Sequence, residues 1–404
     1  MAVIKNRWVF LALACLAELL ALTTWFSATA IMPELQARWQ LGAGASAWLT
    51  NGVQAGFVTG ALALALSGLP DRVALHRLTA AAAMLAALAN LALLADLGAG
   101  FAIAARIATG MALAGVYPPA VKLLATWFRA GRGFALGLLI GALTLGSSVP
   151  HLVRALGGGA DWRLVVIASS AAAAMAAAVF ALALREGPYP FSRTVVSLKQ
   201  LGAILRDRPV MLANLGYFGH MWELYALWGW FLAYASAAKA AGTALAGIDA
   251  SLLTFAVVGI GIAGAAGGGL LADRIGRCHA TAIAMGLSGL CAFLIGFAFD
   301  GPAWAFILIA LVWGITVIAD SAQFSAAVTE LADPSRVGSA LAFQMGVGFA
   351  ITIAVIWLLP VAAGFLGSWR WVFLVLVPGP AVGIWAMLAL RRMEESRKMA
   401  GGLR

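Results

Sequence analysis

Residues Glu18–Phe26 read ELLALTTWF, and residues Glu223–Phe231 read ELYALWGWF. Six of the nine positions are identical at an offset of 205 residues. Each stretch is apolar or aromatic apart from the glutamate at its start and one or two threonines or glycines. One match of this kind arises easily in an apolar chain, so a repeat is inferred only if further matches follow in the same order.

Two shorter motifs supply those matches. Asp71-Arg72 recurs as Asp273-Arg274 at an offset of 202, and Trp162-Arg163 recurs as Trp369-Arg370 at an offset of 207. Both contain charged residues, which a biased apolar composition does not generate. The sequence therefore predicts two similar halves, and parallel repeats of six helices are an architecture of secondary transporters.

The composition restricts the class of protein. Of 404 residues, 63% are hydrophobic and 10% are charged, whereas a soluble domain has about 25% charged residues. A soluble core cannot bury so much apolar surface, so soluble enzymes, disordered proteins and nucleic-acid binders are excluded. The net charge of +10 then indicates basic loops on one side of a membrane rather than a nucleic-acid partner.

Windows of about 20 apolar residues mark the predicted membrane spans. A basic, proline-containing stretch at 185–209 separates six spans from six others, which predicts an all-α integral membrane protein of two pseudo-symmetric six-helix bundles. The predicted domains are residues 1–184, a cytoplasmic linker at 185–209, and residues 210–404 with a short basic tail. The twelve predicted spans are 8–30, 47–69, 78–95, 100–124, 133–155, 163–184, 210–233, 250–271, 280–299, 303–326, 337–360 and 370–390.

The distribution of basic residues predicts the orientation. With the N-terminus inside, 20 of the 26 Lys and Arg residues lie in inside segments, which favours cytoplasmic positions for both termini. The compact, Ala-rich chain indicates a bacterial inner (plasma) membrane, with the lipid bilayer as its surroundings. A monomer is expected.

The loop after the eighth span reads Gly269-Leu-Leu-Ala-Asp-Arg-Ile-Gly-Arg277. This stretch is similar to the signature loop G-x-L-x-D-R-x-G-R of the major facilitator superfamily, and Arg106-x-x-x-Gly110 resembles a further element of that family. The resemblance covers essentially the whole chain and implies transport by alternating access. Within the family the chain is loosely similar to bacterial cyanate and organic-anion permeases. The nitrate permeases carry an arginine in spans 2 and 8, and none is placed there here.

The signature loop and its degraded first-half copy predict a gate on the cytoplasmic side. A carboxylate there can accept hydrogen bonds from a helix N-terminus or pair with an arginine. In the family such contacts close the cytoplasmic side; the alternative is a tight turn that only sets topology, with glycines allowing its geometry. The predicted gate residues are Asp71, Arg72, Asp273, Arg274, Gly269 and Gly276.

Two carboxylates lie at repeat-related positions inside predicted spans. Glu18 lies about halfway through span 1, and Glu223 lies at the equivalent depth of span 7. An ionisable group at this depth is costly and marks a functional site by default. The resemblance implies that spans 1 and 7 line a central cavity, so we expect the two to face each other and to bind and release protons. The alternative is one packing carboxyl in each half.

Three further polar residues at membrane depth are candidates for substrate or proton contacts. His220 shares a helix face with Glu223, which suits a proton relay, a cation site or a structural role; a metal is not expected. Arg106 could bind an anion or snorkel to the outer interface. Asp320 is either a third cavity charge or a residue near the inner mouth.

Aromatic and amide side chains complete the predicted site. Trp25 and Trp230 each lie seven residues after a candidate glutamate, so they could form an outer gate or belong to the aromatic belt. Gln54 is interpreted either as a hydrogen-bond donor to the cavity or as helix-packing glue. His151 and Arg154 either belong to the outer interface or attract anions there.

The sequence therefore predicts a proton-coupled permease for a small molecule, with a small anion weakly favoured. It predicts no enzyme and no cofactor, because it contains no nucleotide-binding motif and no catalytic constellation. One alternative is proton-driven multidrug efflux. Another is a non-transporting assembly factor or sensor, for which the carboxylates inside the spans would have no use.

Overall fold

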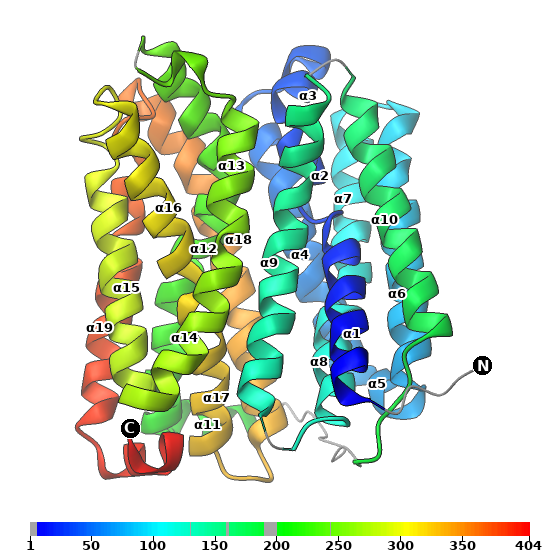
Figure 1. Ribbon diagram of the computed structural model, residues 1–404, viewed down its shortest axis with the longest axis vertical. Coiled ribbons are helices and arrows are strands. Elements are labelled where there is room, and N and C mark those ends of the chain that lie inside the picture. Colours follow the sequence, from blue (N-terminus) through cyan, green and yellow to red (C-terminus); the bar gives the residue numbers. More distant parts are fainter. Residues whose placement is uncertain (1–5, 130, 159–160, 190–199, 243) are drawn as a thin grey trace. The chain divides into compact units, whose positions relative to one another are not determined.

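The computed structural model describes residues 6–129, 131–158, 161–189, 200–242 and 244–404, and within them it contains helices and no strand. The chain divides into two compact units, residues 1–193 and 194–404. The N-terminal unit (the N-half) runs from blue to green in Figure 1, and the C-terminal unit (the C-half) from green to red. Lys5, and Pro190, Arg193 and Lys199 of the predicted linker, lie outside the described residues.

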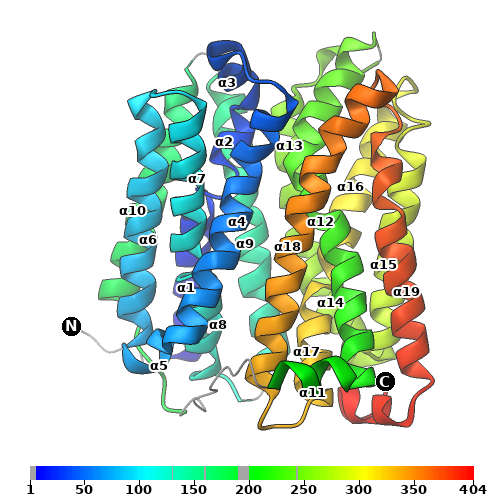
Figure 2. The same ribbon diagram turned by 180° about the vertical axis from the view of Figure 1, so that it is seen from behind.

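Six long helical paths make up the N-half, several of them interrupted. In this half α1 begins at the same end as α5, while α3 lies at the opposite end (Figures 1 and 2). Its helices are α1 (Arg7–Leu22), α2 (Ser27–Ala30), α3 (Met32–Trp39), α4 (Ala43–Ser67), α5 (Leu69–Arg72), α6 (Leu75–Leu91), η1 (Ala92–Ala95), α7 (Ala99–Leu113), α8 (Tyr117–Ala125), α9 (Arg132–Leu156) and α10 (Trp162–Leu182).

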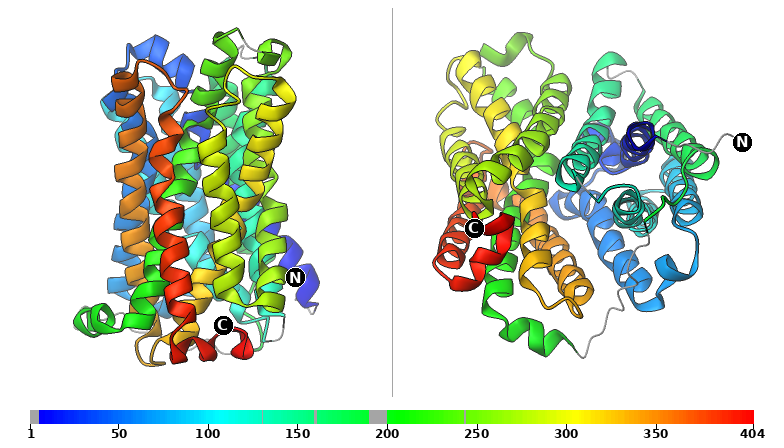
Figure 3. Two further views of the ribbon diagram at one scale, coloured as in Figure 1. Left: turned by 90° about the vertical axis from the view of Figure 1, so that its left-hand side faces the viewer. Right: turned by 60° about the horizontal axis from the view of Figure 1, so that its bottom comes forward.

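The C-half repeats this plan. Here α11, α17 and the C-terminal segment share one end of the bundle (Figures 1 and 3). Its helices are α11 (Leu201–Arg206), α12 (Arg208–Ala240), η3 (Ala244–Gly247), α13 (Ala250–Gly259), α14 (Gly261–Ile275), α15 (Arg277–Leu294), α16 (Ala303–Ala319), α17 (Ser321–Leu331), α18 (Val337–Leu366), η4 (Val372–Leu376), α19 (Pro378–Arg391) and η5 (Glu394–Gly402).

Ten helical segments of the described chain are long and apolar enough to cross a membrane. The two predicted spans outside this set are the first and the seventh, which carry Glu18 and Glu223. The first falls short because α1 has only 16 residues. The seventh, α12, has 33 residues but carries polar residues along with many Trp and Tyr side chains. With these two helices the structure agrees with the predicted twelve.

The first predicted span, 8–30, is not one continuous helix. Helix α1 ends at Leu22, and the chain turns through residues 23–26 before α2 begins. The hydroxyl groups of Thr23 and Thr24 donate to the carbonyls of Leu20 and Ala21, at 2.7 and 2.9 Å. Hydroxyl side chains that bond to nearby carbonyls compete with the helical ladder, which favours a break at this point.

Breaks also occur inside other predicted spans. Span 4 is divided into α7 and α8, span 8 into α13 and α14 at Ile260, and span 10 into α16 and α17 at Asp320. The last break places Asp320 at a helix junction rather than inside a continuous helix.

The predicted linker contains a short helix near its C-terminal end. Residues Leu201–Arg206 form α11, and α12 already begins at Arg208. Asp207 caps α12 by accepting a hydrogen bond from the Val210 amide at 3.3 Å, and Pro209 occupies the first turn. An Asp cap followed by proline is a strong helix start, and it outweighs the basic charge of this stretch.

Glycines bring the same helix pairs close together in both halves. In the N-half, a Cβ on Gly56 would collide with the backbone of Ile107, and one on Gly110 with that of Val53. In the C-half, a Cβ on Gly264 would meet the Ile315 carbonyl, and one on Gly314 the Val257 carbonyl. Small residues allow such backbone contact within a membrane. The pairs α4–α7 and α13/α14–α16 therefore form the closest seams of their bundles.

Candidate transport site

Glu18 lies on α1 one turn before the helix ends. Its side chain is 0% exposed, and neither carboxylate oxygen has a hydrogen-bond partner among the described residues. An ionised carboxylate requires donors or a cation when it leaves water. Glu18 has neither within the described chain, so a proton is the simplest means of neutralising it.

The break that follows Glu18 is held by Arg106 of α7. The Arg106 Nη1 atom donates to the Thr24 carbonyl at 2.9 Å and to Ser27 Oγ at 3.2 Å. Nη2 donates to the Trp25 carbonyl, while Nε has no partner among the described residues. The guanidinium thus satisfies carbonyls that the interrupted helix leaves open.

Asn90 of α6 extends this network across the N-half. Its Oδ1 accepts from Arg106 at 3.0 Å and from Ser27 Oγ at 2.5 Å. Its Nδ2 donates to Ser170 Oγ of α10 at 2.9 Å and to the Val166 carbonyl at 3.3 Å. Arg106 is 0% exposed, so it does not snorkel to an interface. Both its terminal nitrogens already serve internal acceptors.

Glu223 has a different environment from its repeat partner. Its Oε1 accepts from Trp313 Nε1 of α16 at 2.6 Å, and its Oε2 accepts from Ser288 Oγ of α15 at 2.8 Å. The carboxyl group is buried, with both oxygens bound inside the C-half. That Glu18 and Glu223 face each other remains a prediction.

His220 and Asp320 form a buried pair in the C-half. His220 Nδ1 lies 2.8 Å from Asp320 Oδ1, within ion-pair distance but without the geometry of a hydrogen bond, and the two side chains are 1% and 2% exposed. His220 Nε2 has no partner among the described residues. The imidazole packs against Tyr217 and Phe324, with ring centroids 6.0 and 5.7 Å away. The predicted relay paired His220 with Glu223, whereas the charged partner of His220 in the structure is Asp320.

Both candidate gate tryptophans are buried inside their own halves. The Trp25 ring lies 5.2 Å from that of Phe57, and Trp230 donates from Nε1 to the Ile356 carbonyl at 2.9 Å. Their exposure of 3% each does not fit a belt that faces lipid headgroups. An outer gate formed by these rings remains a prediction.

The first-half copy of the signature loop forms an ion pair within the N-half. Asp71 Oδ1 lies 2.7 Å from Lys122 Nζ of α8, so this ion pair joins the ends of spans 2 and 4. Arg72 is exposed and makes no ion pair within the described chain. Lys122 was not among the predicted gate residues, although its position as a basic residue at the end of a span could have identified it.

In the second-half loop, Arg277 rather than Asp273 makes the contacts. Asp273 and Arg274 are exposed, with no ion pair in the described part of the chain, and Gly269 has open space around it. Arg277 binds both carboxylate oxygens of Glu330, at 2.7 and 2.5 Å. A bidentate arginine is geometrically specific, so Arg277 is a stronger candidate for a latch than the two residues predicted.

Gly276 is the one loop glycine whose backbone conformation requires glycine. Its φ is +86°, and a Cβ there would meet the backbone of Leu403 and Arg404. The Arg404 carbonyl also accepts from the Cys278 amide at 3.3 Å. The segment η5 therefore packs directly on the signature loop, at one end of the C-half (Figure 3).

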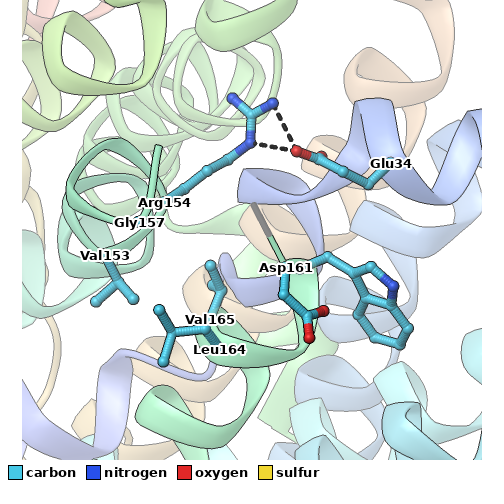
Figure 4. Close-up of a pocket in the computed structure, with 8 residues that line it drawn as sticks. Glu34, Val153, Arg154, Gly157, Asp161, Leu164 and Val165 are labelled. Atoms are coloured by element: carbon cyan, nitrogen blue, oxygen red, sulfur yellow. Dashed lines mark hydrogen bonds and ion pairs between the residues drawn. The ribbon is translucent and has the colours of Figure 1, made fainter. Parts of the chain in front are cut away.

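A small pocket opens at the α3 end of the N-half (Figure 4). Arg154 Nε and Nη2 lie 2.8 and 2.7 Å from Glu34 Oε1. Arg154, which the sequence offered as a group that attracts anions, is therefore already paired with a carboxylate of its own half. The pocket lining is Glu34, Val153, Arg154, Gly157, Asp161, Trp162, Leu164 and Val165.

The arrangement of two repeated six-helix units defines the class of fold, which is that of the major facilitator superfamily. Among solved structures, the chain is similar to that family's proton:xylose symporter XylE, bound to 6-bromo-6-deoxy-D-glucose. The TM-score is 0.72 with 14% identity, over 96% of this chain and 95% of that chain. No family model and no curated protein matches the sequence. At this identity the likeness establishes the fold, as the signature loop predicted.

Proposed function

We propose that this protein is a proton-coupled secondary transporter of a small polar molecule, working by alternating access between its halves. The fold supports this proposal, and so does the similarity to XylE, a proton:xylose symporter. Proton coupling rests mainly on one observation: Glu18 is fully buried, with neither carboxylate oxygen bound by a described residue. Neutralisation of this carboxyl by one proton would change the local charge by one unit without requiring a cofactor.

His220 and Asp320 are proposed as a second protonation site. Their 2.8 Å contact lies in the C-half, and His220 shares a helix face with Glu223. Glu223 itself is better suited to positioning, because Trp313 and Ser288 already bind both of its oxygens. The proposal therefore assigns proton binding to Glu18 and to the His220–Asp320 pair.

The preference for a small anion is not retained in this proposal. It rested on Arg106, His151, Arg154 and His220. Arg106 is bound to backbone carbonyls and Arg154 to Glu34. His220 is paired with Asp320. A small, uncharged polar molecule is a better match to what remains.

The test is transport in liposomes containing the full chain and an internal pH dye. Glu18→Gln keeps the shape of the side chain but cannot titrate. We expect it to abolish accumulation driven by a pH gradient while leaving substrate exchange without a gradient in place. Glu18→Asp should retain part of the coupling. The exposed Glu394→Gln serves as the matched control. Proton-driven accumulation by Glu18→Gln at the wild-type level would refute the role of Glu18.

A further inference from the structure

Several buried side chains of the N-half carry polar atoms without a partner among the described residues, and besides Glu18 they include three on α4 and α9. Gln54 on α4 has none at Oε1 or Nε2; on α9, Ser147 Oγ and His151 Nδ1 also have none. These residues are 0%, 1% and 1% exposed. Buried polar groups in native proteins are almost always hydrogen-bonded, so three such residues in one half require an explanation.

Gln54 faces the broken part of span 1. Thr50, Gln54 and Phe57 lie on one face of α4, because they are spaced by four and three residues. Thr50 Oγ1 lies 3.1 Å from Thr29 Oγ1 on α2, and the Phe57 ring packs on Trp25 in the break. Gln54 lies between these two contacts and therefore borders the segment from Trp25 to Thr29.

Ser147 and His151 border the same part of the chain from α9. Ser147, His151 and Arg154 share one face of α9, again at spacings of four and three residues. Arg154 at the end of this face binds Glu34 on α3, and α9 also packs against α2. The hydroxyl and the imidazole therefore approach the α2–α3 segment from the side of α9.

Three arginines of this region are already engaged by groups inside the N-half. Arg106 donates to two carbonyls and two side chains, Arg154 pairs with Glu34, and Arg38 pairs with Asp96. Glu18 is assigned to proton binding above. The atoms that Gln54, Ser147 and His151 offer a ligand are an amide oxygen and nitrogen, a hydroxyl and an imidazole nitrogen. This is a mixed set of donors and acceptors without a fixed charge.

We propose that Gln54, Ser147 and His151 form a substrate subsite for an uncharged molecule that carries several hydroxyl groups. The proposal rests on the transport function proposed above and names the class of substrate. A hydroxyl group both donates and accepts, so it matches an amide, a serine and a neutral imidazole together. A carboxylate or an inorganic anion only accepts, and an ammonium only donates.

The experiment measures saturable uptake by the full chain in liposomes. The probes are D-xylose, D-glucose and their monodeoxy analogues, compared with acetate, benzoate, cyanate and the cationic dye ethidium. The variants are Ser147→Ala, Gln54→Leu and His151→Phe. Ser148→Ala is the matched control, because this neighbouring hydroxyl already donates to the Leu145 carbonyl of its own helix at 2.7 Å.

We expect saturable uptake of a hydroxylated probe, with its half-saturation concentration raised about fivefold to tenfold by Ser147→Ala and unchanged by Ser148→Ala. Wild type should take up one monodeoxy analogue more weakly than the parent sugar. Ser147→Ala should take up that analogue and the parent sugar equally well, because the analogue and the variant remove the same hydrogen bond. Equal melting temperatures for the two serine variants exclude misfolding as the cause.

The other outcomes separate this inference from the proposed function. Proton-linked uptake of an anion or of ethidium, without uptake of a hydroxylated probe, would overturn the inference and leave the transporter standing. Hydroxylated probes taken up equally by wild type and all three variants would place the subsite elsewhere. Absence of saturable uptake for every probe would contradict both proposals.

Discussion

At the scale of single residues, repeat-related positions do not have equivalent surroundings. Glu18 and Glu223 occupy the same place in the repeat, yet only Glu223 has donors, at 2.6 and 2.8 Å. The difference depends on Trp313 and Ser288, which are distant in sequence. A similar point holds for Arg106, whose sequence position allowed an anion contact or snorkelling and whose guanidinium instead supports a helix break.

Replacing Arg106 should destabilise the N-half. Arg106→Met keeps the apolar stem but leaves the carbonyls of Thr24 and Trp25 without this donor, at a cost of about 2–4 kcal/mol. Arg106→Lys should fall between wild type and Met, because a lysine lacks the planar fork. Thermal unfolding in detergent measures the loss, and hydrogen exchange at residues 23–27 should rise. An unchanged melting temperature for Arg106→Met would show that the break is stable without Arg106.

At the scale of helices, backbone contact holds the closest seam of each half together. The carbonyls of Ile107 and Val53 occupy the space that a side chain on Gly56 or Gly110 would need. The C-half uses Gly264 and Gly314 in the same way. Backbone atoms cannot move aside as a flexible side chain does, so the seam tolerates no added atom.

The α4–α7 seam can be tested by one methyl group. Gly56→Ala should lower stability by about 1–3 kcal/mol, because the two helices must separate or bend. Gly100→Ala on α7 is the control: no atom lies within 4 Å of the added Cβ, and alanine favours a helix. Thermal melting of both variants gives the comparison. Equal stability of Gly56→Ala and wild type would show that α4 and α7 have room for an added methyl group at this contact.

An ion pair connects α3 to the turn after η1, and its contribution should depend on pH. Arg38 and Trp39 donate to the Asp96 carboxylate; chiefly the hydrogen bond from Arg38 holds the pKa of Asp96 below its ordinary value of 3.8. A lowered folded-state pKa means that the stabilisation is present above pH 3.8 and is lost as the pH falls below it.

The matched variant is Asp96→Asn, since asparagine tolerates the left-handed backbone of this position, with φ of +56°. Its melting temperature should lie below that of wild type at neutral pH and converge with it below pH 3.8. A difference that stayed constant across this range would show that the ion pair contributes nothing to stability.

At the scale of the whole molecule, each half is a compact unit with its own buried core. The N-half core contains, for example, Ile31, Leu49 and Val166. The proposed proton sites are divided between the units, with Glu18 in one and the His220–Asp320 pair in the other. The proposed mechanism needs both units, because alternating access is a motion of one against the other.

We therefore expect the two halves, expressed as separate chains, to assemble into a functional transporter. Co-expressed fragments 1–193 and 194–404 should each reach the membrane, purify together and restore proton-linked uptake. Either fragment alone should give no uptake, because it lacks half of the proposed sites. Failure of either fragment to accumulate, with the intact chain as the control, would show that the halves depend on each other for folding.

The sequence by itself determined the class of fold, the number of spans, the repeat and the positions of the buried charges. These features can be read from local composition and from the spacing of motifs along the chain, because a membrane span appears in the sequence as a stretch of about 20 apolar residues. It also indicated Gly276, Glu18 and Glu223 as residues to examine. It did not indicate the short helix α11 near Arg206 or the helix cap at Asp207.

Only the tertiary structure decided which polar groups are satisfied. The bonds from Arg106 to Thr24, from Trp313 to Glu223 and from Arg277 to Glu330 join residues that lie 53 to 90 positions apart. No local pattern encodes such pairs, because they depend on how the helices pack. The same packing breaks span 1 and leaves Glu18 and Gln54 without partners in the described part of the chain. Whether a buried polar group serves structure or substrate is decided by its neighbours in space, and the chain brings those neighbours together only when it folds.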